Sequence, residues 1–112
     1  MSAQYLQVQT SIDSRDEAGK LMRSVVEARL AACAKIVGPI TSTYWWQGEV
    51  ETDEEWLVLM KTPAGRYEEL QEHIKRNHSY DVPEILAFPV VAGNPDYLHW
   101  LTEETGTRAE PT

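Results

Sequence analysis

The sequence has 112 residues, of which 42% are hydrophobic and 25% are charged, a balance typical of one globular domain rather than of a disordered chain. Ten basic residues stand against 18 acidic ones, so the net charge is −8. This charge argues against a nucleic-acid partner, which attracts clustered Lys and Arg, and it is compatible with binding of cations.

The N-terminal region predicts a strand followed by a helix. Residues 4–10 alternate between apolar and polar side chains, which is typical of a strand. Ser14 and Glu17 form a capping box, in which the serine side chain accepts a backbone N–H at the start of a helix. Apolar residues then recur at helical spacing, so we expect a helix over 15–31.

The next segment, 33–61, predicts a long β-hairpin. Gln47-Gly48 is a suitable two-residue turn because glycine tolerates the positive φ that such turns need. The arms 34–46 and 49–61 then pair, and each spans ~43 Å at ~3.3 Å per residue. A second interpretation places the turn in the acidic stretch 51–54.

The segment after the hairpin predicts a helix and a strand. Thr62-Pro63 is typical of an N-cap followed by proline at the first helical position, and we expect this helix to end near Asn77. The apolar run 85–92 predicts a strand covered on both faces. Pro89 within this run favours an edge strand or a bulge.

A short last helix completes the predicted fold. Asn94 precedes Pro95, a second capped helix start. The element order is then βαββαβ plus a terminal helix, which predicts an α+β, ferredoxin-like sandwich with a long central hairpin. We expect one domain over 1–104 and a flexible tail over 105–112.

The length of the hairpin predicts an oligomer. Its arms are about twice as long as the second helix, which spans ~20 Å at 1.5 Å per residue. Part of the hairpin must therefore project past the helices, and a bare two-stranded arm is marginally stable in water. The aromatic residues expected at an interface between copies of the chain are Tyr44, Trp45, Trp46 and Trp56. The alternative is that the terminal helix folds back over the arm.

The sequence carries no signal for export, for the membrane or for catalysis. Cys33 is the only cysteine, so no disulfide can form within the chain, and we expect a cytoplasmic protein. No apolar run approaches the ~20 residues of a membrane span, so no membrane partner is expected. Nucleophile elbows, phosphate loops and triad motifs are absent, and we predict that the protein is not an enzyme.

Five ordered blocks resemble segments of the CutA divalent-cation-tolerance family. The similarity runs from Tyr5 to Leu101 and covers nearly the whole chain. The blocks are 27–33 (EARLAAC), 43–49 (TYWWQGE), 61–62 (KT), 78–84 (HSYDVPE) and 93–100 (GNPDYLHW).

This resemblance implies a fold, an assembly and a role. The family is ferredoxin-like and forms a tight homotrimer in which long hairpins pair between subunits. Its implied role is tolerance of, or response to, divalent metal ions, with copper binding in some members. The implied partners are therefore other copies of the chain and a divalent cation such as copper. Because the architecture is similar to PII signalling proteins, the alternative is a small-molecule sensor with ligand clefts between subunits.

The copper pattern of the family is incomplete in this sequence. It uses a Cys at the end of the first strand and a pair of His, but Thr10 and Asn77 stand at two of these positions. A hydroxyl and an amide are poor ligands for copper. His78 remains as a candidate metal ligand, with a hydrogen-bonded surface or interface histidine as its alternative. Cys33 is a second candidate, with a buried structural thiol as its alternative.

Lys61, Tyr80 and Glu84 are candidates for a ligand cleft, because the matching family positions lie near clefts between subunits. The lysine is suited to an anion and the glutamate to a cation. The alternative is an ion pair between subunits that fixes the trimer.

Overall fold

A single antiparallel sheet organises the protein. The structure, a computed structural model, describes residues 3–106. The strands lie in the order β2-β3-β1-β4, and they are β1 (Tyr5–Ile12), β2 (Cys33–Trp46), β3 (Glu49–Pro63) and β4 (Leu86–Pro89). The helices are α1 (Arg15–Glu27), the short 3-10 helix η1 (Ala64–Arg66), α2 (Tyr67–Arg76) and α3 (Pro95–Glu104). This order confirms the predicted ferredoxin-like α+β fold.

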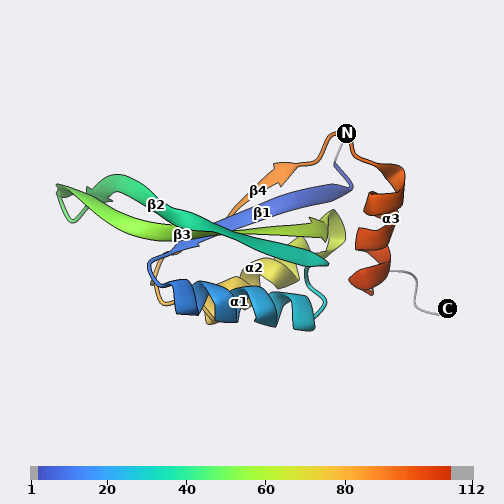
Figure 1. Ribbon diagram of the computed structural model, residues 1–112, viewed down its shortest axis with the longest axis horizontal. Coiled ribbons are helices and arrows are strands. Elements are labelled where there is room, and N and C mark those ends of the chain that lie inside the picture. The colour runs from blue at the N-terminus through green and yellow to red at the C-terminus, as the bar shows by residue number, and fades with distance from the viewer. Residues whose placement is uncertain (1–2, 107–112) are drawn as a thin grey trace.

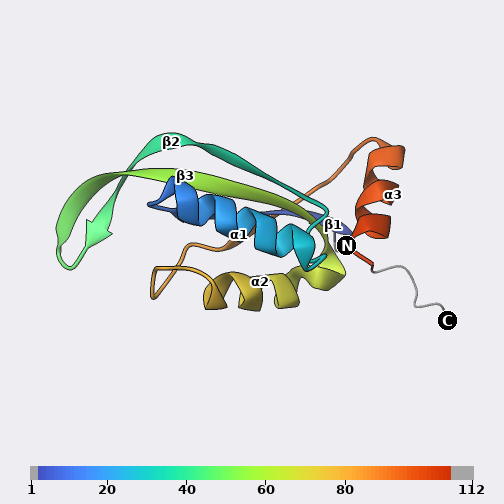
Figure 2. The same cartoon turned by 60° about the horizontal axis from the view of Figure 1, so that its bottom comes forward.

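Two layers enclose the core. Figures 1 and 2 show α1 and α2 on one face of the sheet, and α3 at the end of the sheet away from the hairpin tip. The apolar side chains of α1, α2, β1 and β3 meet between the layers. The buried core residues are Val8, Ile12, Ala18, Leu21, Val25, Leu30, Ala31, Val58, Met60, Leu70 and Ile74. In the described part of the chain, no helix covers the second face, which we call the open face.

The predicted hairpin turn is confirmed. Gln47 (φ 51°) and Gly48 (φ 85°) both adopt the left-handed conformation, and Trp46 pairs with Glu49 on either side of them. The alternative turn at 51–54 is wrong, because those residues pair with β2 inside β3. The hairpin projects past α1 and α2 (Figures 1 and 2), and α3 lies too far from it to cover it.

Three of the four hairpin aromatics are exposed as predicted. Tyr44, Trp45 and Trp46 expose 40%, 74% and 58% of their surface. Trp56 is less exposed and packs partly against the core, and its expected place at an interface stays a prediction. Its ring closes over Gly38, where a Cβ atom would lie 2.5 Å from Cδ1 of the indole. The position of Trp56 is therefore set by its contact with Gly38 and not by packing at the hairpin tip.

Helix α1 ends four residues earlier than predicted. Ala28 caps it, and Arg29 takes a left-handed conformation (φ 60°) that turns the chain out of the helix. The backbone N–H of Leu30 closes this turn on the carbonyl of Val25. Leu30 and Ala31 are buried in the core, so their apolar pattern extended the helical spacing without belonging to the helix.

The sequence predicts a helix start at Thr62-Pro63, and this prediction is wrong. Both residues end β3, where they pair with Leu6 and Tyr5 of β1. The buried Thr62 hydroxyl donates to the carbonyl of Leu30 instead of capping α2. The helix begins at Tyr67, after η1.

The strand predicted over 85–92 is shorter and exposed. β4 comprises only residues 86–89, and all four are exposed in the single chain. Within one chain, the expectation of a strand covered on both faces is therefore wrong. The edge position favoured by Pro89 is confirmed, since β4 pairs only with β1 among the described strands. The predicted starts at Ser14 and Asn94 are both confirmed as N-caps.

The expected tail lies largely outside the described residues. Thr105 caps α3, Gly106 follows it, and the rest of the predicted tail, 107–112, is not described. Among residues 3–106, no helix is long and apolar enough to cross a membrane.

Two buried threonines give a matched test of the core. Thr62 donates to Leu30 O over 2.7 Å, whereas the equally buried Thr10 hydroxyl bonds to none of the described residues. We expect Thr62→Val to cost about 1–2 kcal/mol, because it leaves the Leu30 carbonyl without this donor. Thr10→Val should be neutral or stabilising, since it removes an unpaired polar group. Urea unfolding at one fixed protein concentration measures both, and equal losses would contradict this account.

Candidate functional site

His78 is held between two backbone groups just after α2. Its Nε2 lies 2.9 Å from the carbonyl oxygen of Ser11, which can only accept, so this nitrogen carries the proton. Its Nδ1 accepts the backbone N–H of Tyr80 over 3.0 Å. Both nitrogens of the neutral ring are therefore engaged, and a metal ion can bind only by displacing one of these bonds.

The surroundings of His78 favour the neutral ring. Burial lowers the pKa of His78 below its ordinary value of 6.5, and this effect outweighs the opposing influence of the Ser11 carbonyl and of the acidic Asp13 and Glu55. A neutral imidazole is the form that binds metals, so the ring has the right charge state although both nitrogens are occupied.

Tyr80 connects the loop after α2 to the hairpin. Its hydroxyl donates to Oε2 of Glu55 over 2.6 Å, and its ring lies 4.8 Å from that of His78. Glu55 is 8% exposed. Burial, followed by the hydrogen bond to Glu55, raises the pKa of Tyr80. The tyrosine therefore remains a neutral donor that stabilises a buried carboxylate.

Glu55 was not among the site residues expected from the sequence. Residues 51, 53 and 55 lie on the same face of β3, and the carboxyl groups of all three raise the pKa of Tyr44. The hydrogen bond that Tyr44 donates to Asp53 is the largest contribution, and the pKa of Tyr44 rises to about 12. No local signal distinguishes Glu55, because its partner Tyr80 lies 25 residues away.

Of the three cleft candidates, Tyr80 lies away from Lys61 within a single chain. Glu84 accepts a hydrogen bond from Gln9 over 2.8 Å, on β1. Lys61 lies near the end of β3, opposite Gln7 and Cys33. Tyr80 bonds to Glu55, which precedes Lys61 by six residues on β3. Six residues of extended strand separate Glu55 from Lys61 by ~20 Å. The expected cleft between subunits stays a prediction.

Cys33 lies at one end of the sheet, opposite Lys61, whereas Ser11, the partner of His78, lies opposite Leu57 near the middle of β3. It is the first residue of β2, and its Sγ is 3.2 Å from the hydroxyl of Tyr97 on α3. The thiol is free and partly exposed rather than fully buried. Burial, with the hydrogen bond to Cys33 second, raises the pKa of Tyr97 to about 12. Among residues 3–106, no cluster of three or more His, Cys, Asp or Glu side chains could hold a metal ion.

Comparison with known proteins identifies the family of this chain. The family model of the CutA1 divalent ion tolerance protein matches residues 6–104. The chain belongs to this family. The resemblance deduced from the five sequence blocks is thereby confirmed.

Individual relatives agree over most of the chain. The divalent-cation tolerance protein CutA of Thermus thermophilus is 47% identical over 96 residues, which is 86% of this chain and 93% of that protein. The chloroplastic protein CutA 1 of Oryza sativa is 43% identical over 88% of this chain, which spans only 55% of the rice protein. The solved Cut A1 structure from T. thermophilus superimposes with a TM-score of 0.88, at 45% identity, over 91% of this chain and 99% of that one.

The environment of His78 predicts a pH dependence of stability. Because its pKa in the folded protein is below 6.5, the unfolded chain binds more protons once the pH falls below that value, and stability falls with it. We expect His78→Gln to lose less stability than the wild type between pH 7 and pH 5. Burial and the charge of Arg76 also lower the pKa of His73. Part of the loss of stability at low pH therefore remains in both proteins. Urea unfolding across this range gives the difference, and a difference independent of pH would contradict the prediction.

Proposed function

We propose that the protein is a homotrimer that functions in tolerance of, or response to, divalent metal ions, and that it acts by binding rather than by catalysis. Family membership supports the role, and the resemblance supplies the number three. The observation that carries the assembly is the exposed apolar surface of the open face and hairpin. Its most exposed members are Val37, Trp45, Trp46, Val50, Leu86 and Phe88, at 43–74% of their surface.

The two edges of the sheet are suited to a closed ring. β2, with the projecting hairpin, forms one edge, and the short β4 forms the other. An unpaired strand edge exposes backbone donors and acceptors that another chain can pair with. Contact between unlike edges of successive subunits is heterologous, and such contacts close into a ring when the rotation permits. Large exposed apolar patches of this kind mark interfaces between proteins.

The assembly is tested by light scattering at micromolar concentration. We expect a wild-type mass of three times the 12.8 kDa of the chain. Introducing two charges on the open face with Leu86→Asp and Phe88→Asp should lower the mass toward that of one chain. Ala28→Asp is the matched control, because Ala28 is exposed at the end of α1 on the helical side. A wild-type mass of one chain would rule out the trimer.

For the metal ion, His78 and Cys33 are the candidate ligands that the chain supplies. They lie at different positions along the sheet, since Cys33 is opposite Lys61 and Ser11, the partner of His78, is opposite Leu57. Further ligands for either must come from a neighbouring subunit or from solvent. Zinc and copper accept imidazole nitrogen, and thiolate selects the softer Cu(I). Displacement of the Ser11 or Tyr80 hydrogen bond from His78 opposes binding, so the proposed site is weak.

Copper and zinc titration of the metal-free protein tests this site. We expect saturable binding of about one ion per chain, weakened at least about tenfold by His78→Ala through loss of the imidazole ligand. His99→Ala is the matched control, because this histidine is 73% exposed on α3 and lies outside the proposed site. If His78→Ala binds both metals like the wild type, the metal site is not at His78.

A PII-like sensor is the second candidate function. The observation that favours it is Lys61, which lies at the open face opposite Cys33 and Gln7 and forms no ion pair with any described residue. An unpaired ammonium is suited to an anionic group of a small molecule. Thermal shift against metals and nucleotides separates the two, because a ligand at 100 times its Kd stabilises by about 2.7 kcal/mol. We place either function in the cytoplasm, where the free thiol of Cys33 stays reduced.

A further inference from the structure

Helix α3 is attached to the rest of the chain through its last turn. Leu101 and Thr105 are buried there, and the hydroxyl of Tyr5 lies 2.6 Å from that of Thr102. Most of residues 95–100 are exposed. The C-terminal turn is therefore the firm end of the helix, and the N-terminal half extends from it.

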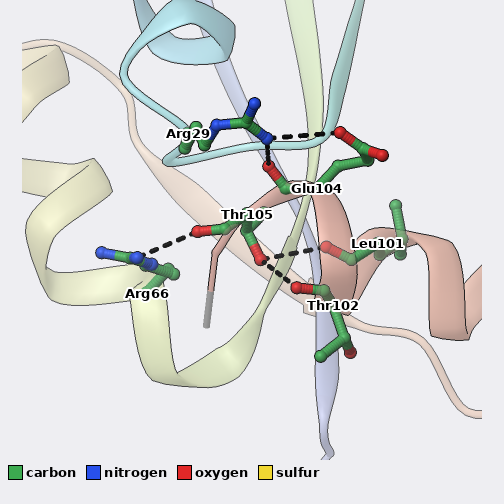
Figure 3. Close-up of polar contacts among 6 residues, drawn as sticks. All are labelled: Arg29, Arg66, Leu101, Thr102, Glu104 and Thr105. Atoms are coloured by element: carbon green, nitrogen blue, oxygen red, sulfur yellow. Dashed lines mark hydrogen bonds and ion pairs between the residues drawn. The ribbon is translucent and has the colours of Figure 1, made fainter. Parts of the chain in front are cut away.

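Arg29 holds this last turn from the α1–β2 junction. Its Nη1 donates to the backbone carbonyl of Glu104 over 2.7 Å and to the Glu104 carboxylate over 3.2 Å (Figure 3). The residue occupies a left-handed conformation (φ 60°), which is unfavourable for a residue with a side chain. The contact thus joins a strained turn of one element to the end of another.

Arg66 holds the same turn from η1. Its Nη2 donates to the carbonyl of Thr105 over 2.9 Å (Figure 3). Its Nη1 pairs with Glu69 over 2.8 Å. The last carbonyls of a helix have no partners within the helix and carry the negative end of its dipole. Two guanidinium groups from two separate elements therefore cap one helix end.

We propose that Arg29 and Arg66 form a clamp on the C-terminal end of α3, and that opening this clamp releases the whole helix and uncovers Cys33. The N-terminal half of α3 reaches the sheet through Tyr97, whose hydroxyl lies 3.2 Å from Sγ of Cys33 and whose ring stacks on Trp100. This contact depends on the helix being held at its other end. Both arginines and their partners belong to one chain, so the clamp does not require the trimer.

The two halves of the clamp differ in their exposure to solvent. The Arg29 side chain is 60% exposed, and it borders a surface hollow of about 490 Å³ lined also by Glu103, Glu104 and Gly106. The Arg66 side chain is 24% exposed. Salt screens exposed ion pairs more strongly than partly buried ones. Ionic strength therefore acts on the Arg29 half, which makes it the half that opens first.

Amide hydrogen exchange and alkylation of Cys33 test the clamp in the full chain. We expect Arg29→Gln and Arg66→Gln each to speed exchange of amides 98–105 about tenfold, because each loses charge-assisted hydrogen bonds. Alkylation of Cys33 by iodoacetamide should speed up by a similar factor. Arg23→Gln is the matched control, since its pair with Glu27 is exposed and lies within α1. The amides of β1 and β3 must stay protected in every variant.

Two results would overturn the proposal. If exchange accelerates only at residues 104–106, the arginines are local caps and do not hold the helix. If amides 98–105 accelerate while Cys33 alkylation stays at the wild-type rate, α3 does not cover the thiol. Should Arg66→Gln unfold the chain, Arg29→Gln decides alone, because most of that side chain is in solvent.

Discussion

The pairing of β3 with both β1 and β2 is the constraint on which the other features of the structure depend. Its 15 residues form the hairpin with β2 at one end and the centre of the sheet at the other. Because side chains alternate along a strand, the register that buries Val58 and Met60 against the helices sends Leu59 and Lys61 to the open face. One register therefore fixes the core, the exposed surface and the positions of Glu55 and Cys33 together.

Features set by neighbours in the sequence could be predicted, and features set by distant contacts could not. The turn at Gln47-Gly48 and the caps at Ser14 and Asn94 depend on residues at most three positions apart, and the structure has all three as expected. Thr62 carries a similar capping signal, but pairing with β1 and the carbonyl of Leu30 outweighs it. Trp56 likewise follows its contact with Gly38 and the core rather than its membership of the hairpin.

The candidate site shows the same division. His78 and Tyr80 could be singled out from a short motif, since they lie two residues apart. Their partners could not be foreseen, because Ser11 contributes only a backbone carbonyl, and Glu55 resembles any surface carboxylate in sequence. Composition and spacing indicate which side chains are able to bind a ligand, whereas hydrogen bonds across the sheet determine which of their atoms remain available.

The dispersal of these groups bears directly on how the protein functions. Within one chain, Cys33 and Lys61 lie near one end of the sheet, whereas His78 and Tyr80 bond near its middle, at Ser11 and Glu55. The described residues of a single chain bring no three metal-binding side chains together. A binding site that combined these groups would need a second subunit, as in the proposed trimer, with the apolar open face as the surface of contact. In the proposed trimer, a ligand recognised at such a site would also stabilise the oligomer.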